Sequence, residues 1–131
     1  MAKTKMRRKK SKRAVLRDDA DKLYQIKLIG EKPRSVVSGE PTEVIHHFVP
    51  KSQSNNLRYD YENGVPLTHK EHARHHLSGD PSIVAKILKV NGQEWFDDVE
   101  AVRKEGAKFT KEWITIQLKI LQDLLNELRK I

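Results

Sequence analysis

EVIHHFVPKSQSNNLRYDYENGVPLTHKEHARHH, from Glu43 to His76, is the stretch of sequence that decides the fold of this chain. All six histidines of the 131-residue protein lie within it. A histidine scattered in a sequence is usually an ordinary surface or core residue, but a cluster of this density predicts a metal site. The cluster consists of one adjacent pair, a second pair four residues apart and two further histidines: His46 and His47, His72 and His76, and His69 and His75.

The spacing of these residues indicates which of them share a metal ion. His72 and His76 would lie on one face of a helix, so that both rings could reach one cation. In a strand, His46 and His47 would point to opposite faces, so only one of the two can join them. A set of three ligands leaves a coordination position open, which is typical of catalytic rather than structural sites. The free imidazole of the adjacent pair could then deprotonate a water molecule.

This pattern resembles the HNH, or ββα-metal, nuclease family. The resemblance is carried by His46, His47, Pro50, Ser52, Asn63, Leu67, His72 and His76. It implies that His47 is the general base, and that His46, His72 and His76 hold one divalent metal ion. It also implies a catalytic role for Asn63, which would fix the loop and orient the base. The implied fold is α+β and mostly helical, with a small ββα core over about 43–77, a flanking N-terminal helix and C-terminal helices over about 80–131.

The chain departs from many HNH proteins in having no cysteine. Where relatives carry two cysteine pairs, this chain has Ser35–Gly39 and Thr68–Glu71. Hydroxyl groups are poor zinc ligands compared with thiolates, so no structural zinc is expected. Packing or hydrogen bonds must replace it. The wider layout is loosely similar to the NinG/Rap type of phage recombination nuclease, through Ala20–Tyr24, Leu57–Tyr59 and Ser78–Asp80.

The periodicity predicts the remaining elements. A first helix is expected from about Val15 to Ile29, with Gly30 as its stop. Strands are expected at about 43–49 and 64–67, joined by a loop at 50–62, and the metal-binding helix at about 68–77, with His69 and His75 facing solvent or phosphate. Asp80 and Pro81 predict the start of a helix that ends at Asn91-Gly92. Further helices are expected at about 93–105 and 111–130, the last with Thr110 as its cap. Its leucine-rich stripe favours packing within the chain, although it could also form a homodimer seam.

Charge is concentrated at the N-terminus. The formal net charge is +8, and nine of the 26 lysines and arginines lie in the first 17 residues, which contain no acid. Residues 1–13 are therefore predicted to be a disordered basic arm that contacts phosphates, although such a tail could instead serve solubility or localisation. Residues 14–131 are predicted to form a single nuclease domain. The predicted nucleic-acid contacts are Arg7, Arg8, Lys9, Lys10, Lys12, Arg13, Lys51 and Arg58.

These observations favour a metal-dependent DNA endonuclease that uses one divalent ion (Mg, Mn, Zn or Ni), with unknown sequence preference, as a monomer or homodimer. The alternative is a non-catalytic nucleic-acid-binding accessory protein on the same fold. No apolar run is long enough to cross a membrane. The absence of cysteine fits a reducing cytoplasm, that of a bacterial host cell if the chain is of phage origin. The resemblance points to phage or mobile-element DNA recombination or processing.

Overall fold

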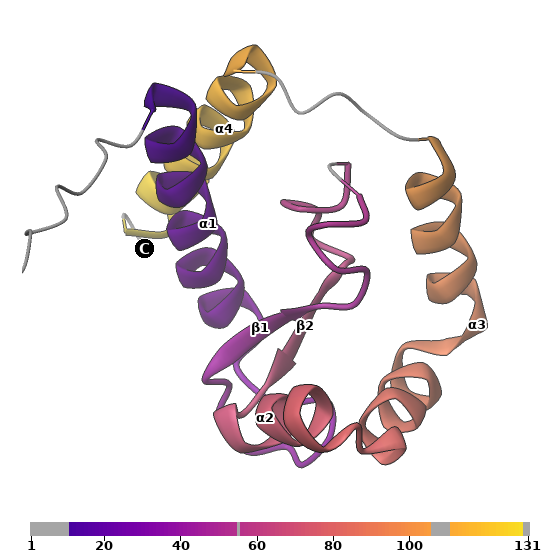
Figure 1. The fold of residues 1–131 in the computed structure, drawn as a ribbon. Helices are drawn as coiled ribbons and strands as arrows, with labels where there is room; N and C mark the ends of the chain where they lie inside the picture. The colour runs from indigo at the N-terminus through magenta and orange to yellow at the C-terminus, as the bar shows by residue number, and fades with distance from the viewer. Residues whose placement is uncertain (1–10, 55, 106–110, 130–131) are drawn as a thin grey trace, which may run out of the picture.

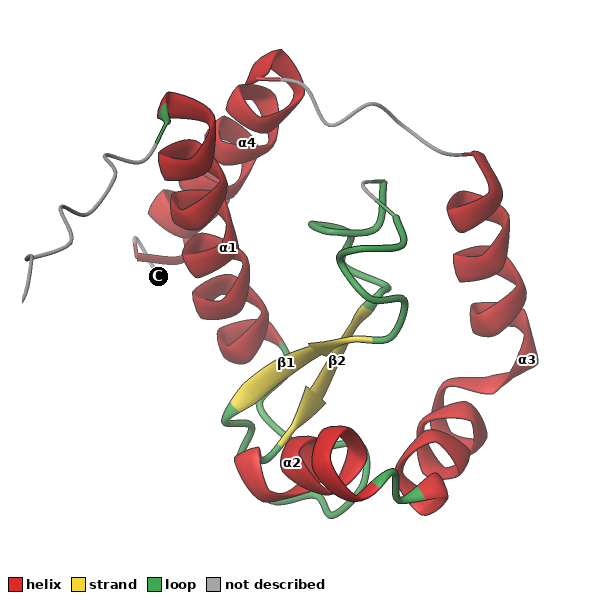
Figure 2. Cartoon of the chain, viewed as in Figure 1, coloured by secondary structure: helices red, strands yellow, loops and turns green. Residues whose placement is uncertain are grey.

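The computed structural model describes residues 11–54, 56–105 and 111–129. Their fold is α+β and mostly helical, with one two-stranded antiparallel sheet. Helices α1 and α4 lie side by side on one side of the β-hairpin, and α3 lies on the other (Figure 1, Figure 2). The elements in chain order are α1 (Lys12–Glu31), β1 (Val44–His47), β2 (Gly64–Leu67), α2 (His69–Ser78), α3 (Pro81–Glu105) and α4 (Lys111–Arg129).

Helix α1 is longer at both ends than the sequence predicted. The Ser11 hydroxyl accepts a hydrogen bond from the Ala14 backbone N–H at 3.1 Å, which caps the helix N-terminus. Lys12 and Arg13 are therefore helical, and the predicted arm boundary at residue 13 is wrong. Residues 1–10 lie outside the described part of the chain. Gly30 does not end the helix, which stops instead just before Pro33, because the residue preceding a proline disfavours the helical conformation.

The hairpin places the two adjacent histidines. Strand β1 is shorter than predicted, whereas β2 has the predicted bounds. His46 pairs with Val65 and His47 with Gly64 in the antiparallel register. Consecutive side chains of a strand point to opposite faces, so the two histidine rings enter different surroundings. Every residue of β2 is buried, which fixes this strand between the helices.

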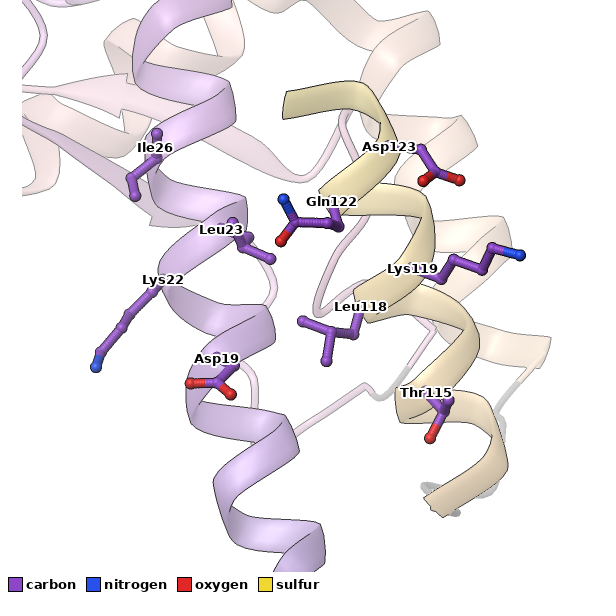
Figure 3. Close-up of a pocket in the computed structure, with 9 residues that line it drawn as sticks. All are labelled: Asp19, Lys22, Leu23, Ile26, Thr115, Leu118, Lys119, Gln122 and Asp123. Atoms are coloured by element: carbon purple, nitrogen blue, oxygen red, sulfur yellow. The ribbon is translucent and has the colours of Figure 1, made fainter. Parts of the chain in front are cut away.

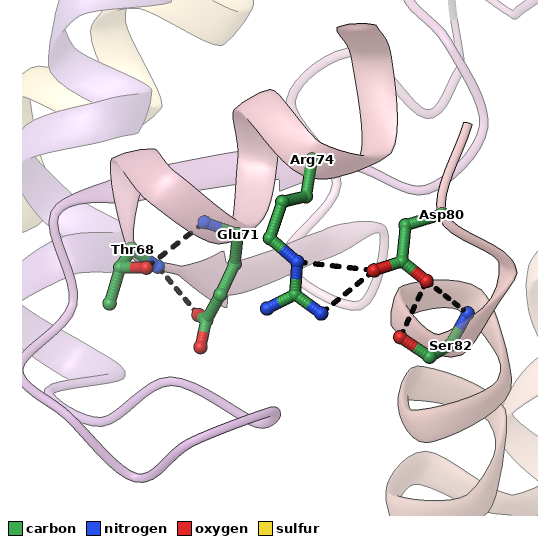
Figure 4. A network of polar contacts seen from close by, with 5 residues as sticks. All are labelled: Thr68, Glu71, Arg74, Asp80 and Ser82. Carbon is green, nitrogen blue, oxygen red and sulfur yellow. Dashed lines mark hydrogen bonds and ion pairs between the residues drawn. The ribbon is translucent and has the colours of Figure 1, made fainter. Parts of the chain in front are cut away.

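The turn between α2 and α3 is held by side chains that Figure 4 shows. Asp80 accepts hydrogen bonds from the Ser82 backbone at 2.9 Å and the Ser82 hydroxyl at 2.7 Å, as expected of a residue that caps α3. The Arg74 guanidinium donates to the same carboxylate at 2.7 and 3.1 Å. Gly79 at the end of α2 has a φ of 60°, a left-handed conformation that favours glycine. The two helices are thus fixed at a sharp junction.

Helix α3 covers the two helices that the sequence predicted on either side of Asn91-Gly92. The structure confirms this division, because α3 consists of two helical segments separated by a kink at Gly92, where φ is 87° and ψ is 170°. This glycine therefore separates the two helical segments at the predicted position. Beyond the break, Val99 is buried, and Trp95 packs against it and against the hairpin side of the core.

Helix α4 packs along α1, in agreement with the favoured interpretation of its apolar stripe as an intramolecular contact. Ile114, Leu121 and Leu125 are buried. Leu121 joins Ala20, Tyr24 and Leu28 of α1 in one core cluster. The predicted cap, Thr110, lies outside the described residues. Among the described helices, no segment combines the length and the apolar character needed to span a membrane.

Candidate metal centre and general base

The four predicted site histidines border one cavity of about 230 Å³, whereas Asn63 is not part of its lining. It lies where β1, the loop after it, α1 and α2 meet. Three of the cluster histidines come from the two ends of the β1–β2–α2 segment, and His47, Lys51 and Gln25 also contribute polar groups to the lining. The full set is Gln25, Val44, Ile45, His46, His47, Pro50, Lys51, His72 and His76.

His46, His72 and His76 converge as the spacing predicted. One ring nitrogen from each lies within 4.8 Å of the others. The Nε2 atoms of His72 and His76 are 2.9 Å apart, and the rings of His46 and His72 have centroids 5.2 Å apart. Two imidazoles on one tetrahedral zinc, with Zn–N bonds of about 2.05 Å, have nitrogens roughly 3.3 Å apart. The three rings therefore need only small rotations to share one ion.

The protonation of two of these rings suits metal binding, because only a neutral imidazole has a free lone pair. Burial lowers the pKa of His46 to about 3, and the neighbouring histidines act in the same direction. Burial and His76 also lower the pKa of His72. Both rings are therefore neutral at pH 7 in the folded protein. The three-histidine donor set fits one divalent cation and leaves a coordination position for water or substrate.

His75 is closer to this cluster than the sequence predicted. The expected position was off the face formed by His72 and His76, towards solvent or phosphate. Its ring centroid nevertheless lies 4.9 Å from that of His46 and 4.9 Å from that of His76. The His46 ring contacts both His75 and His76 of α2, so its contacts are not limited to the face formed by His72 and His76. His69 is exposed at the start of α2.

His47 points to the other face of β1 and has its own contacts, although it borders the same cavity as His46. Its Nε2 is 2.8 Å from the Arg58 carbonyl oxygen. A carbonyl can only accept, so Nε2 carries the hydrogen and Nδ1 holds the free lone pair. The ring also stacks on Tyr24, with centroids 5.0 Å apart. Burial lowers the pKa of His47 to about 4, although the bond to Arg58 opposes the shift. The His47 ring is therefore neutral at pH 7.

Asn63 is fully buried and closes the long loop between the strands. Its side-chain oxygen accepts from the Val49 N–H at 2.8 Å. Its side-chain nitrogen donates to the carbonyls of Val49 and Leu57, each at 3.1 Å. These contacts suit the loop-fixing role that the resemblance implies. The connection to His47 runs through the backbone from Leu57 to Arg58.

Helix α1 contributes residues that the sequence did not reveal. The Gln25 side chain donates to the Ile45 carbonyl and accepts from the Ile45 N–H, both at 2.9 Å. It thereby pairs with the free edge of β1 next to His46. Tyr24 donates from its hydroxyl to the Asp60 carbonyl at 2.9 Å while its ring supports His47. The only sequence signal for these contacts is the spacing of Asp21, Tyr24 and Gln25, which places the three residues on one face of a helix.

A hydrogen bond joins the Ser35–Gly39 segment to the Thr68–Glu71 segment. The Ser35 hydroxyl donates to the Glu71 carboxylate at 2.5 Å, and both residues are buried. Glu71 also forms a capping box with Thr68 at the start of α2 (Figure 4). Burial raises the pKa of Glu71, but the hydrogen bonds from Ser35, Ser38 and Thr68 outweigh it and lower the pKa. This pair connects the 32–41 loop to the helix that carries His72.

The predicted nucleic-acid contacts separate into four groups. Lys51 is exposed at the cavity edge, where a phosphate could reach it. Arg58 is instead paired with Asp21, at 2.9 and 2.7 Å. Lys12 and Arg13 are exposed on the first turn of α1. The other four, Arg7, Arg8, Lys9 and Lys10, lie outside the described residues.

A larger groove of about 580 Å³ lies between α1 and α4 (Figure 3). Its floor contains Leu23, Ile26 and Leu118, and its rim carries Asp19, Lys22, Lys119 and Asp123. None of the groups that line it is a histidine, and its apolar floor offers no acid, base or metal ligand. The smaller histidine cavity is therefore the candidate site. No protein-family model matches the chain, and comparisons with curated proteins and with solved structures found no significant match.

Proposed function

We propose that this protein is a metal-dependent DNA endonuclease of the HNH type. The observation that carries the proposal is the different placement of two neighbouring histidines, His46 and His47. His46 meets His72 and His76 at one point, whereas His47 faces a carbonyl and an aromatic ring. A metal site and a neutral imidazole on adjacent residues can together catalyse hydrolysis of a phosphodiester, the metal by stabilising charge and the imidazole by deprotonating water.

In the proposed reaction, His47 Nδ1 takes a proton from a water molecule whose oxygen attacks the phosphorus. The new P–O bond forms as the bond to the 3′ oxygen breaks, and that oxygen takes up a proton from solvent water. The products are a 5′-phosphate and a 3′-hydroxyl, as the family resemblance implies. A divalent cation held by His46, His72 and His76 would polarise the phosphoryl oxygen and stabilise the leaving oxygen. Lys51 at the cavity edge would contact the phosphate backbone.

The three-imidazole set bears on the choice of metal. Imidazole nitrogens favour Zn and Ni over Mg, which prefers oxygen ligands. We expect tight binding of Zn²⁺ or Ni²⁺ and a wide tolerance of metals in cleavage. One base beside one ion cuts one strand, so a single copy should nick a duplex. The proposed setting is the processing or recombination of phage or mobile-element DNA.

Nicking of supercoiled plasmid tests the proposal. Protein stripped of metal is assayed with Mg²⁺, Mn²⁺, Ni²⁺ or Zn²⁺, and with EDTA as the control. The expected result is open-circular product that depends on added metal. A panel of linear duplex, single strand, flap, fork and four-way junction then defines the preferred substrate. Absence of cleavage on every substrate with every metal would refute the nuclease and favour the non-catalytic binding protein.

A further inference from the structure

The Arg58 side chain is held by an acidic residue of α1. Its Nε and one terminal nitrogen donate to the two Asp21 carboxylate oxygens, at 2.9 and 2.7 Å. The side chains of Arg58 and Asp21 are only 13% and 25% exposed. A bidentate pair in this geometry restricts the guanidinium in both distance and orientation. It also fixes the Arg58 backbone relative to α1.

The backbone of the same residue touches the proposed base. The Arg58 carbonyl oxygen lies 2.8 Å from His47 Nε2, and it selects the ring form that carries its hydrogen there. Arg58 lies in the long connection between β1 and β2, whose described residues form no regular strand or helix. Asn63 fixes this loop at Leu57, one residue earlier, through a 3.1 Å bond to the Leu57 carbonyl. The loop is therefore anchored at two consecutive residues.

We propose that Asp21 and Arg58 are positioning residues for His47, a role that rests on the proposed nuclease function. Asp21 holds the Arg58 side chain, and the Arg58 carbonyl holds the His47 ring. The Nδ1 lone pair is thereby kept available and correctly oriented for the attacking water. A displacement of a catalytic group by about 1 Å can lower a rate by up to about 100-fold, which sets the scale of the expected effect.

This role differs from the phosphate contact that the sequence suggested for Arg58. A phosphate contact would make Arg58 contribute to DNA affinity, and loss of Asp21 would strengthen binding by removing a negative charge. If the two residues position His47, loss of either Asp21 or Arg58 should instead lower kcat, and the two losses should not be additive. Arg58→Ala is informative here because it removes the guanidinium but keeps the carbonyl that receives His47.

The test compares Asp21→Ala, Arg58→Ala and the double variant in metal-dependent nicking. We expect each single variant to lower kcat by about 10- to 100-fold with little change in KM, and the double variant to lower it no further than the worse single. Arg58→Lys keeps the charge without the bidentate geometry and should recover only part of the rate. Asp19→Ala, an exposed acid on the same helix outside the histidine cavity, is the matched control and should act like wild type.

Nitrogen-15 NMR of the imidazole rings gives a readout that does not need activity. At one fixed pH, the His47 signals, assigned by their loss in His47→Ala, should show hydrogen on Nε2 in the wild type and a mixture of ring forms in Asp21→Ala. If the wild type does not cleave DNA but this shift occurs, the nuclease proposal fails and the positioning contact stands. Unchanged His47 signals together with an unchanged kcat in Asp21→Ala would overturn the inference. An Asp21→Ala protein that loses only DNA affinity or only thermal stability would also overturn the inference.

Discussion

Gly64 lies directly opposite His47 in the antiparallel pair of β1 and β2. A Cβ atom at this position would come closer than 3.0 Å to the side chains of Leu28, Tyr24 and Ile45. Gly64 is therefore required by the close approach of α1 to the hairpin, and not by a left-handed turn. The same contact surface brings the Tyr24 ring against His47.

Gly64→Ala should accordingly destabilise the protein by about 1–3 kcal/mol, because inserting a methyl group forces the packed side chains apart. Urea unfolding near neutral pH measures the free energy of unfolding. Gly30→Ala is the matched control, since a methyl group on that helical glycine would have no atom within 4 Å and the change should stabilise by about 0.5–1 kcal/mol. Equal stability of Gly64→Ala and wild type would contradict the close packing of α1 on the hairpin.

Metal affinity should depend on the three converging histidines and not on their neighbours. His72→Ala removes a ring that meets His76 and His46, and we expect Zn²⁺ or Ni²⁺ affinity to fall at least about 10-fold in calorimetry. His69→Ala provides the control from the same helix, as this exposed residue is not part of the converging set. Undiminished affinity in His72→Ala would place the metal elsewhere.

The stability of the metal-free protein should fall as the pH is lowered from about 6.5 towards 3. The folded-state pKa values are about 3 for His46 and about 4 for His47, both below the ordinary value of 6.5. At a pH between the folded-state pKa and 6.5, each of these histidines is protonated more in the unfolded chain than in the folded protein, so acid favours unfolding. The free energy of unfolding should then fall by up to about 1.4 kcal/mol per pH unit for each residue. Urea unfolding in the presence of EDTA, repeated from pH 6.5 to pH 3, measures this dependence of the free energy of unfolding on pH. His46→Phe should flatten the slope, and the same slope in both proteins would refute the assignment.

Removal of residues 1–10 should weaken DNA binding without altering the chemistry. This deletion takes away Lys3, Lys5, Arg7, Arg8, Lys9 and Lys10 but keeps Ser11, which caps α1. Affinity should fall for every DNA sequence alike. The slope of log affinity against log salt should flatten by about 0.9 for each phosphate that the protein no longer neutralises. A truncated protein with unchanged affinity and salt slope would show that the segment does not bind DNA.

Much of the site could be predicted because its residues are close in sequence. The spacing of His72 and His76 needs only a helix, and the alternation of His46 and His47 needs only a strand. Their convergence follows once β1, β2 and α2 are consecutive. The capping residue Asp80 and the break at Gly92 were also visible, because their local chemistry determines them.

The parts that could not be predicted depend on interactions between distant segments. Nothing in the sequence pairs Gln25 with Ile45, Asp21 with Arg58 or Ser35 with Glu71. The predicted start of α1 is too late because the basic residues around Ser11 obscure its role as a helix cap. The contact of His75 with His46 could not be predicted because a helical face alone does not indicate the direction from which His46 approaches.

His47→Ala is the most direct test of the proposal that His47 is the base of a metal-dependent phosphodiester hydrolase. The measurement is single-turnover nicking at saturating protein and metal, with DNA and metal binding verified for the variant. We predict a loss of at least about 100-fold in the cleavage rate with both affinities retained, since general base catalysis typically contributes about 10²–10⁴-fold. Cleavage at the wild-type rate by a metal-loaded His47→Ala protein would contradict the proposal.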